Sequence, residues 1–255
     1  MQFNQDPIAR GLANGNPEDG VWGLVVVALN PFPEVAREPY EAFARQINDI
    51  DKNNAVYVYP FSALHCTVAT ITAFHPTVGY LSSGAVNENN KEEVIQKRND
   101  LMHASRVIFD RVMEPLKTET KHDTYKYTFG KPTISPNAGI MFLADESADE
   151  ITLVRKRLAV EFGIAEGSTM APELQECDYP TDNYIQPNIK HTSFLRYVGD
   201  PDAEFEANFK RLADKHWHDV TWTCDQAMTF TLANELVPYM HISDVHRLHR
   251  RQFGT

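Results

Sequence analysis

The sequence has few cysteines, few basic residues and no long apolar run. Its three cysteines, Cys66, Cys177 and Cys224, are scattered and show no C-x-x-C spacing, so neither a disulfide framework nor a cysteine zinc site is predicted. No apolar run approaches the ~18 residues of a membrane-spanning helix, and the first residues lack the basic and apolar regions of a signal peptide. We therefore expect reduced thiols in a cytoplasmic or nuclear protein with no membrane partner.

Positive charge is also scarce, because 24 Lys and Arg stand against 35 Asp and Glu, which gives a net charge of −11. A protein held to duplex nucleic acid by counterion release needs a basic face, so we expect no duplex DNA partner. A single nucleotide can still bind in one local pocket. The 255 residues, 42% of them hydrophobic, are enough for one large domain or two small lobes with a real core.

The spacing of apolar residues predicts strands and helices in alternation. Strands are expected at 21–29, 55–60, 64–73, 125–129, 139–144, 188–198, 220–232 and 237–243. Helices are expected at 34–50, 91–114, 149–162 and 202–217. The charged segment 115–124 is expected to be exposed, and 76–90 and 163–188 to be irregular. We expect a single bilobal domain over 21–243, between an irregular N-terminal arm (1–20) and a basic, His-rich tail (244–255) in solvent.

The order of these elements suggests an internal duplication. The strand 64–73 is followed by the helix 91–114 and by two strands, and the strand 189–198 is followed in the same way by the helix 202–217 and two strands. The match lies in the order of elements and not in residue identity. Two similar units around one cleft would present matching side chains toward each other.

The leading strand of each unit contains His-x-Thr or His-x-Ser. The two copies are His65-Cys66-Thr67 and His191-Thr192-Ser193. Residues i and i+2 of a strand share a face, so imidazole and hydroxyl point into the same space. Histidine suits general acid or base catalysis near neutral pH, and a hydroxyl can donate a hydrogen bond to a phosphate oxygen.

The tripeptide alone carries little information, because six of the ten histidines have Ser or Thr at +2. His103 falls in a predicted helix, where i and i+2 diverge. His75 and His122 fall in a turn and a charged loop, and His241 falls on a closing strand. Only His65 and His191 occupy equivalent positions in the two units.

On the segments Leu64-His-Cys-Thr-Val68 and Lys190-His-Thr-Ser-Phe194, the chain resembles the 2H phosphoesterase superfamily, which includes the RNA 2',3'-cyclic phosphodiesterases. The resemblance implies an α+β fold with two pseudo-symmetric lobes of antiparallel sheet, outer helices and a central groove. It also implies that the two histidines and the two hydroxyls face one another across that groove.

The function implied by the resemblance is a metal-independent phosphodiesterase with His65 and His191 as its acid and base and no cofactor. Thr67 and Ser193 would hold the phosphate oxygens. Either histidine could be the acid. We expect a monomer that acts on a small nucleotide or an RNA end and opens a 2',3'-cyclic phosphate to a monophosphate.

Three further residues next to the second motif are candidates for substrate binding: Lys190, Arg196 and Tyr197. Strict alternation places Tyr197 on the face of His191, and Arg196 on the opposite face unless the strand twists or bulges. Aromatic residues before the first motif suit either core packing or stacking on a base: Tyr57, Tyr59 and Phe61. Cys66 points away from His65, which argues against a thiol nucleophile.

Three other functions remain open at this stage. A 2'-5'-linked oligoadenylate is a second possible substrate for the same groups. A nucleotide- or RNA-binding module could keep the groove without turnover. A hydrolase could use a metal held by the tail histidines His241, His246 and His249, but no convincing set of acidic or cysteine ligands completes that site.

Overall fold

The computed structural model describes residues 2–7, 9–10, 23–29, 34–73, 87, 89–119, 123–146, 149–225, 227–234 and 248–252. The strands are β1 (Leu24–Leu29), β2 (Val56–Val58), β3 (Cys66–Thr72), β4 (Tyr125–Phe129), β5 (Thr133–Ile134), β6 (Gly139–Asp145), β7 (His191–Tyr197), β8 (Val220–Cys224), β9 (Thr229–Asn234) and β10 (Leu248–Gln252). The helices are α2 (Glu34–Ile50), α3 (Lys91–Glu119), α4 (Glu150–Glu161), α5 (Pro172–Glu176) and α6 (Phe205–His216), with 3-10 turns η1 (Phe61–Ala63) and η3 (Thr181–Asn183).

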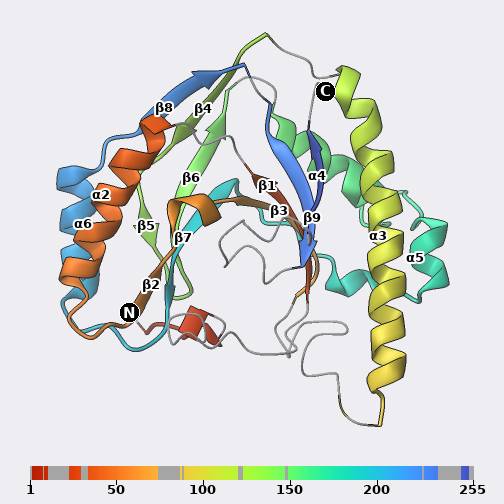
Figure 1. Ribbon diagram of the computed structural model, residues 1–255, viewed down its shortest axis with the longest axis horizontal. Helices are drawn as coiled ribbons and strands as arrows, with labels where there is room; N and C mark the ends of the chain where they lie inside the picture. Colours follow the sequence, from red (N-terminus) through yellow and green to blue (C-terminus); the bar gives the residue numbers. More distant parts are fainter. Residues whose placement is uncertain are drawn as a thin grey trace.

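The strands form one curled antiparallel sheet in the order β10-β9-β1-β3-β7-β6-β4-β8, with β2 beside β7 and β5 beside β6. The helices α2 and α6 lie along one half of the sheet, and α3, α4 and α5 lie along the other (Figure 1). The two motif strands, β3 and β7, are the central neighbours. The expected α+β fold with an antiparallel sheet and outer helices is therefore confirmed.

An aromatic cluster fixes β7 against the first helix pair. The ring of Phe43 on α2 lies 6.2 Å from that of Phe194 on β7, 5.9 Å from that of Phe209 on α6 and 5.3 Å from that of Trp217. All four side chains are buried. Burying one such side chain contributes roughly 1.5–3 kcal/mol, so this cluster holds the second motif strand firmly in place.

The predicted strand 220–232 is wrong, because the chain breaks there into β8 and β9. These two strands pair with β4 and with β1, in different halves of the sheet. The strands β4 and β6, which follow α3, likewise lie beyond β7 and not beside β3. The two predicted units are therefore interleaved. The alternation of apolar residues cannot show this, because it indicates which side chains are buried and not which strands pair.

Other boundaries also differ from the sequence prediction. The helix α3 continues to Glu119 with Leu116 buried, so the start of 115–124 is not an exposed loop. The segment 248–252, predicted as part of a solvated tail, forms β10 on β9. The irregular segment 163–188 contains α5 and η3. The predicted strand 237–243 lies outside the described residues.

Candidate functional site

A β-bulge in β3 determines which of its side chains share a face. Thr67 pairs with Val27 of β1 and Ala69 pairs with Val26, so Val68 is an extra residue on β3. Val68 and Ala69 both pack into the core, whereas Thr67 is partly exposed. Because the bulge adds one residue, the next side chain on the face of Thr67 is that of Thr70, three positions later instead of two.

The strand β7 has a bulge at the equivalent place. Ser193 pairs with Ile140 of β6 and Leu195 pairs with Gly139, so Phe194 is the extra residue. A Cβ on Gly139 would lie 2.7 Å from the ring of Phe194, so only glycine leaves room for that ring. Because Phe194 and Leu195 both enter the core, the alternation shifts and Arg196 returns to the face of Ser193.

One register pair, Cys66 with Thr192, joins β3 to β7. Both side chains are buried, and Cys66 belongs to the hydrophobic core. The four residues next to this pair therefore share the opposite face, which we call the histidine face: His65, Thr67, His191 and Ser193. The structure thus brings together the four main residues of the predicted site.

The register also places each histidine beside the hydroxyl residue of the other motif. In an antiparallel pair centred on Cys66 and Thr192, His65 lies next to Ser193 and Thr67 lies next to His191. The two histidines are diagonal neighbours, which corresponds to a separation of about 7–8 Å in strand geometry. A phosphate between them would meet an imidazole and a hydroxyl from each strand.

Both imidazoles face the backbone carbonyl of the residue two positions earlier. Nδ1 of His65 lies 2.9 Å from the carbonyl oxygen of Ala63. A carbonyl only accepts, so Nδ1 carries the proton and Nε2 is left for chemistry. The carbonyl of Ile189 acts similarly on His191 and raises its pKa. The contact is looser there, because the buried Nδ1 of His191 has no hydrogen bond of ordinary geometry to the described residues.

Burial keeps both histidines neutral near pH 7. His65 is only 6% exposed, and burial, with smaller contributions from the charges of Arg196 and His191, lowers its pKa to about 4 against the pull of the Ala63 carbonyl. Burial is also the main cause that lowers the pKa of His191, to which Arg196 and Arg155 add. A bound anion would favour protonation and oppose these effects.

Arg196 supplies positive charge to the histidine face. Its charge lowers the pKa of both histidines, which fits its return to that face after the bulge. Its Nε donates to the hydroxyl of Tyr59 at 3.3 Å and lies 3.7 Å from Oδ2 of Asp6. The described part of the N-terminal arm is therefore packed, and the backbone N–H of Asp6 donates to the carbonyl of Tyr197 at 2.7 Å.

The structure does not bring Tyr197 and Lys190 to the histidine face. Tyr197 has no exposed surface, its ring lies 4.4 Å from that of Phe3, and its hydroxyl donates to the carbonyl of Ser135 at 3.1 Å. The face predicted for it by strict alternation is wrong, because the bulge at Phe194 shifts the alternation. Lys190 pairs with Asp149, with Nζ to Oδ1 at 2.5 Å.

The aromatic residues before the first motif divide between core and surface. Tyr59 and Phe61 are buried. Tyr57 is partly exposed and pairs with Arg196, which places both on one face. Sequence reasoning missed Phe142, which pairs directly with His191 on β6 and is 45% exposed. The apolar run of that strand gave no sign of which residues would be open.

Sequence reasoning also missed Arg155 on α4. It is 8% exposed and donates to three backbone carbonyls of the motif segments. A signal was present, because Arg155 stands in the apolar stripe of its helix with Ile151, Val154 and Leu158. A cation in such a stripe indicates a buried guanidinium with partners of its own.

Other candidate chemistries find less support in the described residues. Burial raises the pKa of the Cys66 thiol to about 11, which disfavours a thiolate nucleophile. Within the described ranges, no three His, Cys, Asp or Glu side chains are grouped to hold a metal ion, and the tail histidines His241 and His246 lie outside those ranges. None of the described helices combines the length and hydropathy needed to cross a membrane.

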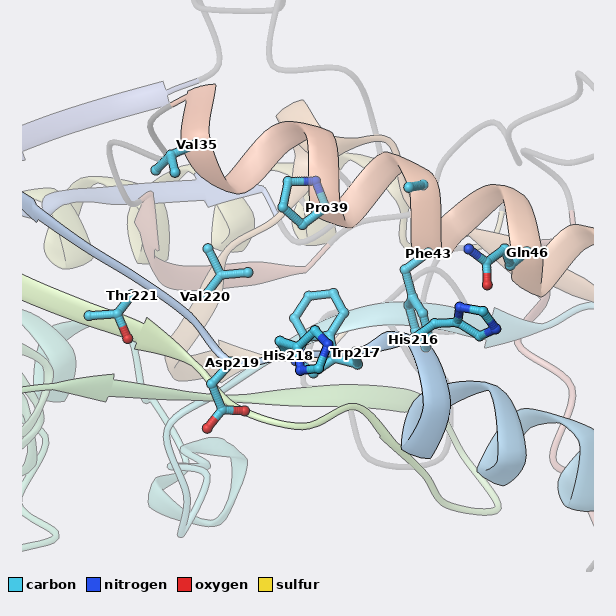
Figure 2. Close-up of a pocket in the computed structure, with 11 residues that line it drawn as sticks. Val35, Pro39, Phe43, Gln46, His216, Trp217, His218, Asp219, Val220 and Thr221 are labelled. Carbon is cyan, nitrogen blue, oxygen red and sulfur yellow. The ribbon is translucent and has the colours of Figure 1, made fainter.

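A cavity of about 390 Å³ lies elsewhere, between α2 and the segment that joins α6 to β8 (Figure 2). Its lining includes His216 and His218, at and just beyond the end of α6, and Phe43 of α2. None of the predicted site residues lines this cavity. It is therefore separate from the two motifs.

Comparison with models of known families and with curated proteins finds no match for the chain. Among solved structures, the chain is similar to the crystal structure of TT0787 of Thermus thermophilus. The TM-score is 0.39 and the sequence identity 12%, over 82% of this chain and 87% of that one. A likeness of this degree carries no argument about function, which has to rest on the geometry of the site.

The position of Arg196 leads to a test by NMR. Replacing it in Arg196→Met should raise the pKa of both His65 and His191, because the positive charge that disfavours their protonation is lost. The measurement is a pH titration of the imidazole signals of protein labelled at histidine. Arg45→Met, which removes an exposed arginine on α2, should leave both unchanged. Unchanged histidines in Arg196→Met would mean that Arg196 lies on the other face.

Proposed function

We propose that the protein is a metal-independent phosphodiesterase that opens the 2',3'-cyclic phosphate of a small nucleotide or an RNA end. The observation that carries the proposal is the crossed arrangement of two histidines and two hydroxyls around the Cys66–Thr192 pair. Each strand supplies one group for proton transfer and one donor for a phosphate oxygen.

The reaction needs two proton transfers at one phosphorus. One histidine, neutral at Nε2, removes a proton from water as the water oxygen bonds to phosphorus. The other histidine, protonated, gives its proton to the 2' or 3' oxygen as the bond from that oxygen to phosphorus breaks. The product is a monophosphate, and the two histidines have exchanged roles. This chemistry is complete without a metal ion.

The two hydroxyls and one cation would stabilise the negative charge of the phosphate. Thr67 and Ser193 would donate to the non-bridging oxygens, where negative charge develops. Arg196 lies on the same face, and its ion pair with Asp6 at 3.7 Å is loose, so a phosphate could compete for the guanidinium. Local binding of this kind agrees with a net charge of −11, which disfavours long polymers.

Phe142 supports a substrate that carries a base. Its ring is half exposed and stands directly beside His191 on the neighbouring strand. Every base has a π-face, and stacking on an aromatic side chain contributes about 1–3 kcal/mol per base. A phosphodiester held at His191 would place its nucleoside within reach of this ring.

Replacing either candidate histidine should abolish turnover. His65→Ala and His191→Ala each remove one of the two proton transfers, for which we expect a loss of about 10²–10⁴-fold in kcat. The measurement is product formation from the four nucleoside 2',3'-cyclic phosphates and from a 2'-5'-linked oligoadenylate, with chelator in excess. The matched control is His103→Ala, because His103 belongs to the same tripeptide pattern but is exposed on α3.

The outcomes of this experiment separate the alternatives. Near wild-type turnover in both variants would contradict the proposal. Tight binding of the panel by the wild-type protein without any product would favour a binding module. Hydrolysis of the 2'-5' linkage alone would assign that substrate to the same groups. Loss of activity in chelator would point to a metal-dependent reaction.

The pH dependence of kcat/KM should reflect the two lowered pKa values. Whichever histidine is the base, the productive protein carries one proton on the pair. Activity should fall as pH drops through about 4, where His65 becomes protonated, and as pH rises through the pKa of His191, which lies below 6.5. We expect an optimum between these limits, whereas an optimum above pH 7 would contradict the account.

A further inference from the structure

Arg155 is a buried cation whose hydrogen bonds go to the backbone of both motifs. It lies on α4 and is 8% exposed. Its Nε donates to the carbonyl of Val68 at 3.0 Å, and its Nη2 donates to the carbonyls of Thr67 at 2.8 Å and Ile189 at 3.2 Å. A buried guanidinium without partners would be very costly, so these carbonyls are what keeps it inside.

The carbonyls that Arg155 contacts lie where the sheet ladder is interrupted. Val68 is the extra residue of the β3 bulge and has no register partner on β1. In the described residues β3 and β7 share a single register pair, Cys66 with Thr192. The chain that leads into β7 is next joined to β3 at Ile185, which exchanges two backbone hydrogen bonds with Thr70 at 2.8 and 2.9 Å. Between these two points the planar fork of Arg155 bridges the two segments.

The third carbonyl is the one that faces His191. The carbonyl of Ile189 favours the protonated form of His191, whereas the charge of Arg155 disfavours it. At the first motif the carbonyl of Ala63 contacts His65 at 2.9 Å, and the charges that act on His65 are those of Arg196 and His191. Arg155 therefore acts on the two histidines unequally, since its charge opposes protonation of His191 and is not among the charges that act on His65.

We infer that Arg155 is a positioning residue, which fastens the Thr67 segment to the Ile189 segment and so fixes the spacing of the two histidines. It lies on α4, and its hydrogen bonds to these segments go to backbone carbonyls, so it acts on the site by holding the strands. Its role in turnover rests on the proposed phosphodiesterase function. Its effect on the position and charge of His191 does not depend on that function.

Two substitutions separate the shape of the side chain from its charge. Arg155→Lys keeps the charge but loses the fork, and Arg155→Met loses both. With the strand spacing relaxed, kcat should fall by about 100-fold in both variants, with little change in KM, because the groups that bind substrate remain. Lys156→Met, which removes the exposed neighbour on the same helix, is the matched control and should keep wild-type kcat.

The second readout is the titration of both histidines by NMR, which needs no substrate. In Arg155→Met the pKa of His191 should rise, because the charge of Arg155 that disfavours its protonation is lost. The pKa of His65 should stay near 4. In Arg155→Lys the pKa of His191 should stay low although kcat falls. If Arg155 only stabilised the fold, Arg155→Met would lower the melting temperature without this selective rise in the pKa of His191.

Several results would overturn the inference. Full activity in Arg155→Lys would show that the fork is not needed, and an unchanged His191 titration in Arg155→Met would show that the contact does not reach the site. Absence of turnover in the wild-type protein would contradict the proposed function alone, because the titration still decides the role of Arg155. If Arg155→Met fails to fold, the comparison of Arg155→Lys with Lys156→Met decides it.

Discussion

The pairing of Cys66 with Thr192 is the constraint on which the rest of the site depends. This one register pair places two buried residues on the packed side of the sheet. Their neighbours must then point the other way, which brings two histidines and two hydroxyls onto a single face. A shift of one residue in this register would put the histidine and hydroxyl of one strand on the opposite face from those of the other. The backbone register therefore determines which side chains form the site.

Packing on the two sides of the junction protects that register. On β7 the bulge at Phe194 places two consecutive apolar residues in the core beneath α2 and α6, and Gly139 leaves room for the ring. On β3 the bulge at Val68 likewise places Val68 and Ala69 in the core, and this strand contacts α4. The two bulges also repeat one pattern, in which the polar face continues three residues after the hydroxyl, at Thr70 and at Arg196. The symmetry of the halves is thus visible at the level of single residues.

The sequence was sufficient to predict the leading strands and the equivalent positions of His65 and His191, because these follow from local periodicity and from the order of elements. The α+β class was implied by the family resemblance of the two motif segments. It could not predict the interleaving of the units, since the alternation of apolar residues in β8 and β9 does not indicate which strands they join. Arg196 and Tyr197 exchanged faces because a bulge is not visible in strand alternation. Phe142 and Arg155 depend on contacts between distant segments, although an arginine in an apolar helical stripe was a usable signal.

The central claim is that one phosphate binds between His65 and His191. The most direct test is to add a nucleoside 2'- or 3'-monophosphate to protein labelled at histidine and to follow the imidazole signals by NMR. The account predicts that both histidines shift at the same nucleotide concentration and that the pKa of both rises, because each contacts the same anion. A nucleotide that saturates the protein while moving one histidine alone, or neither, would contradict it.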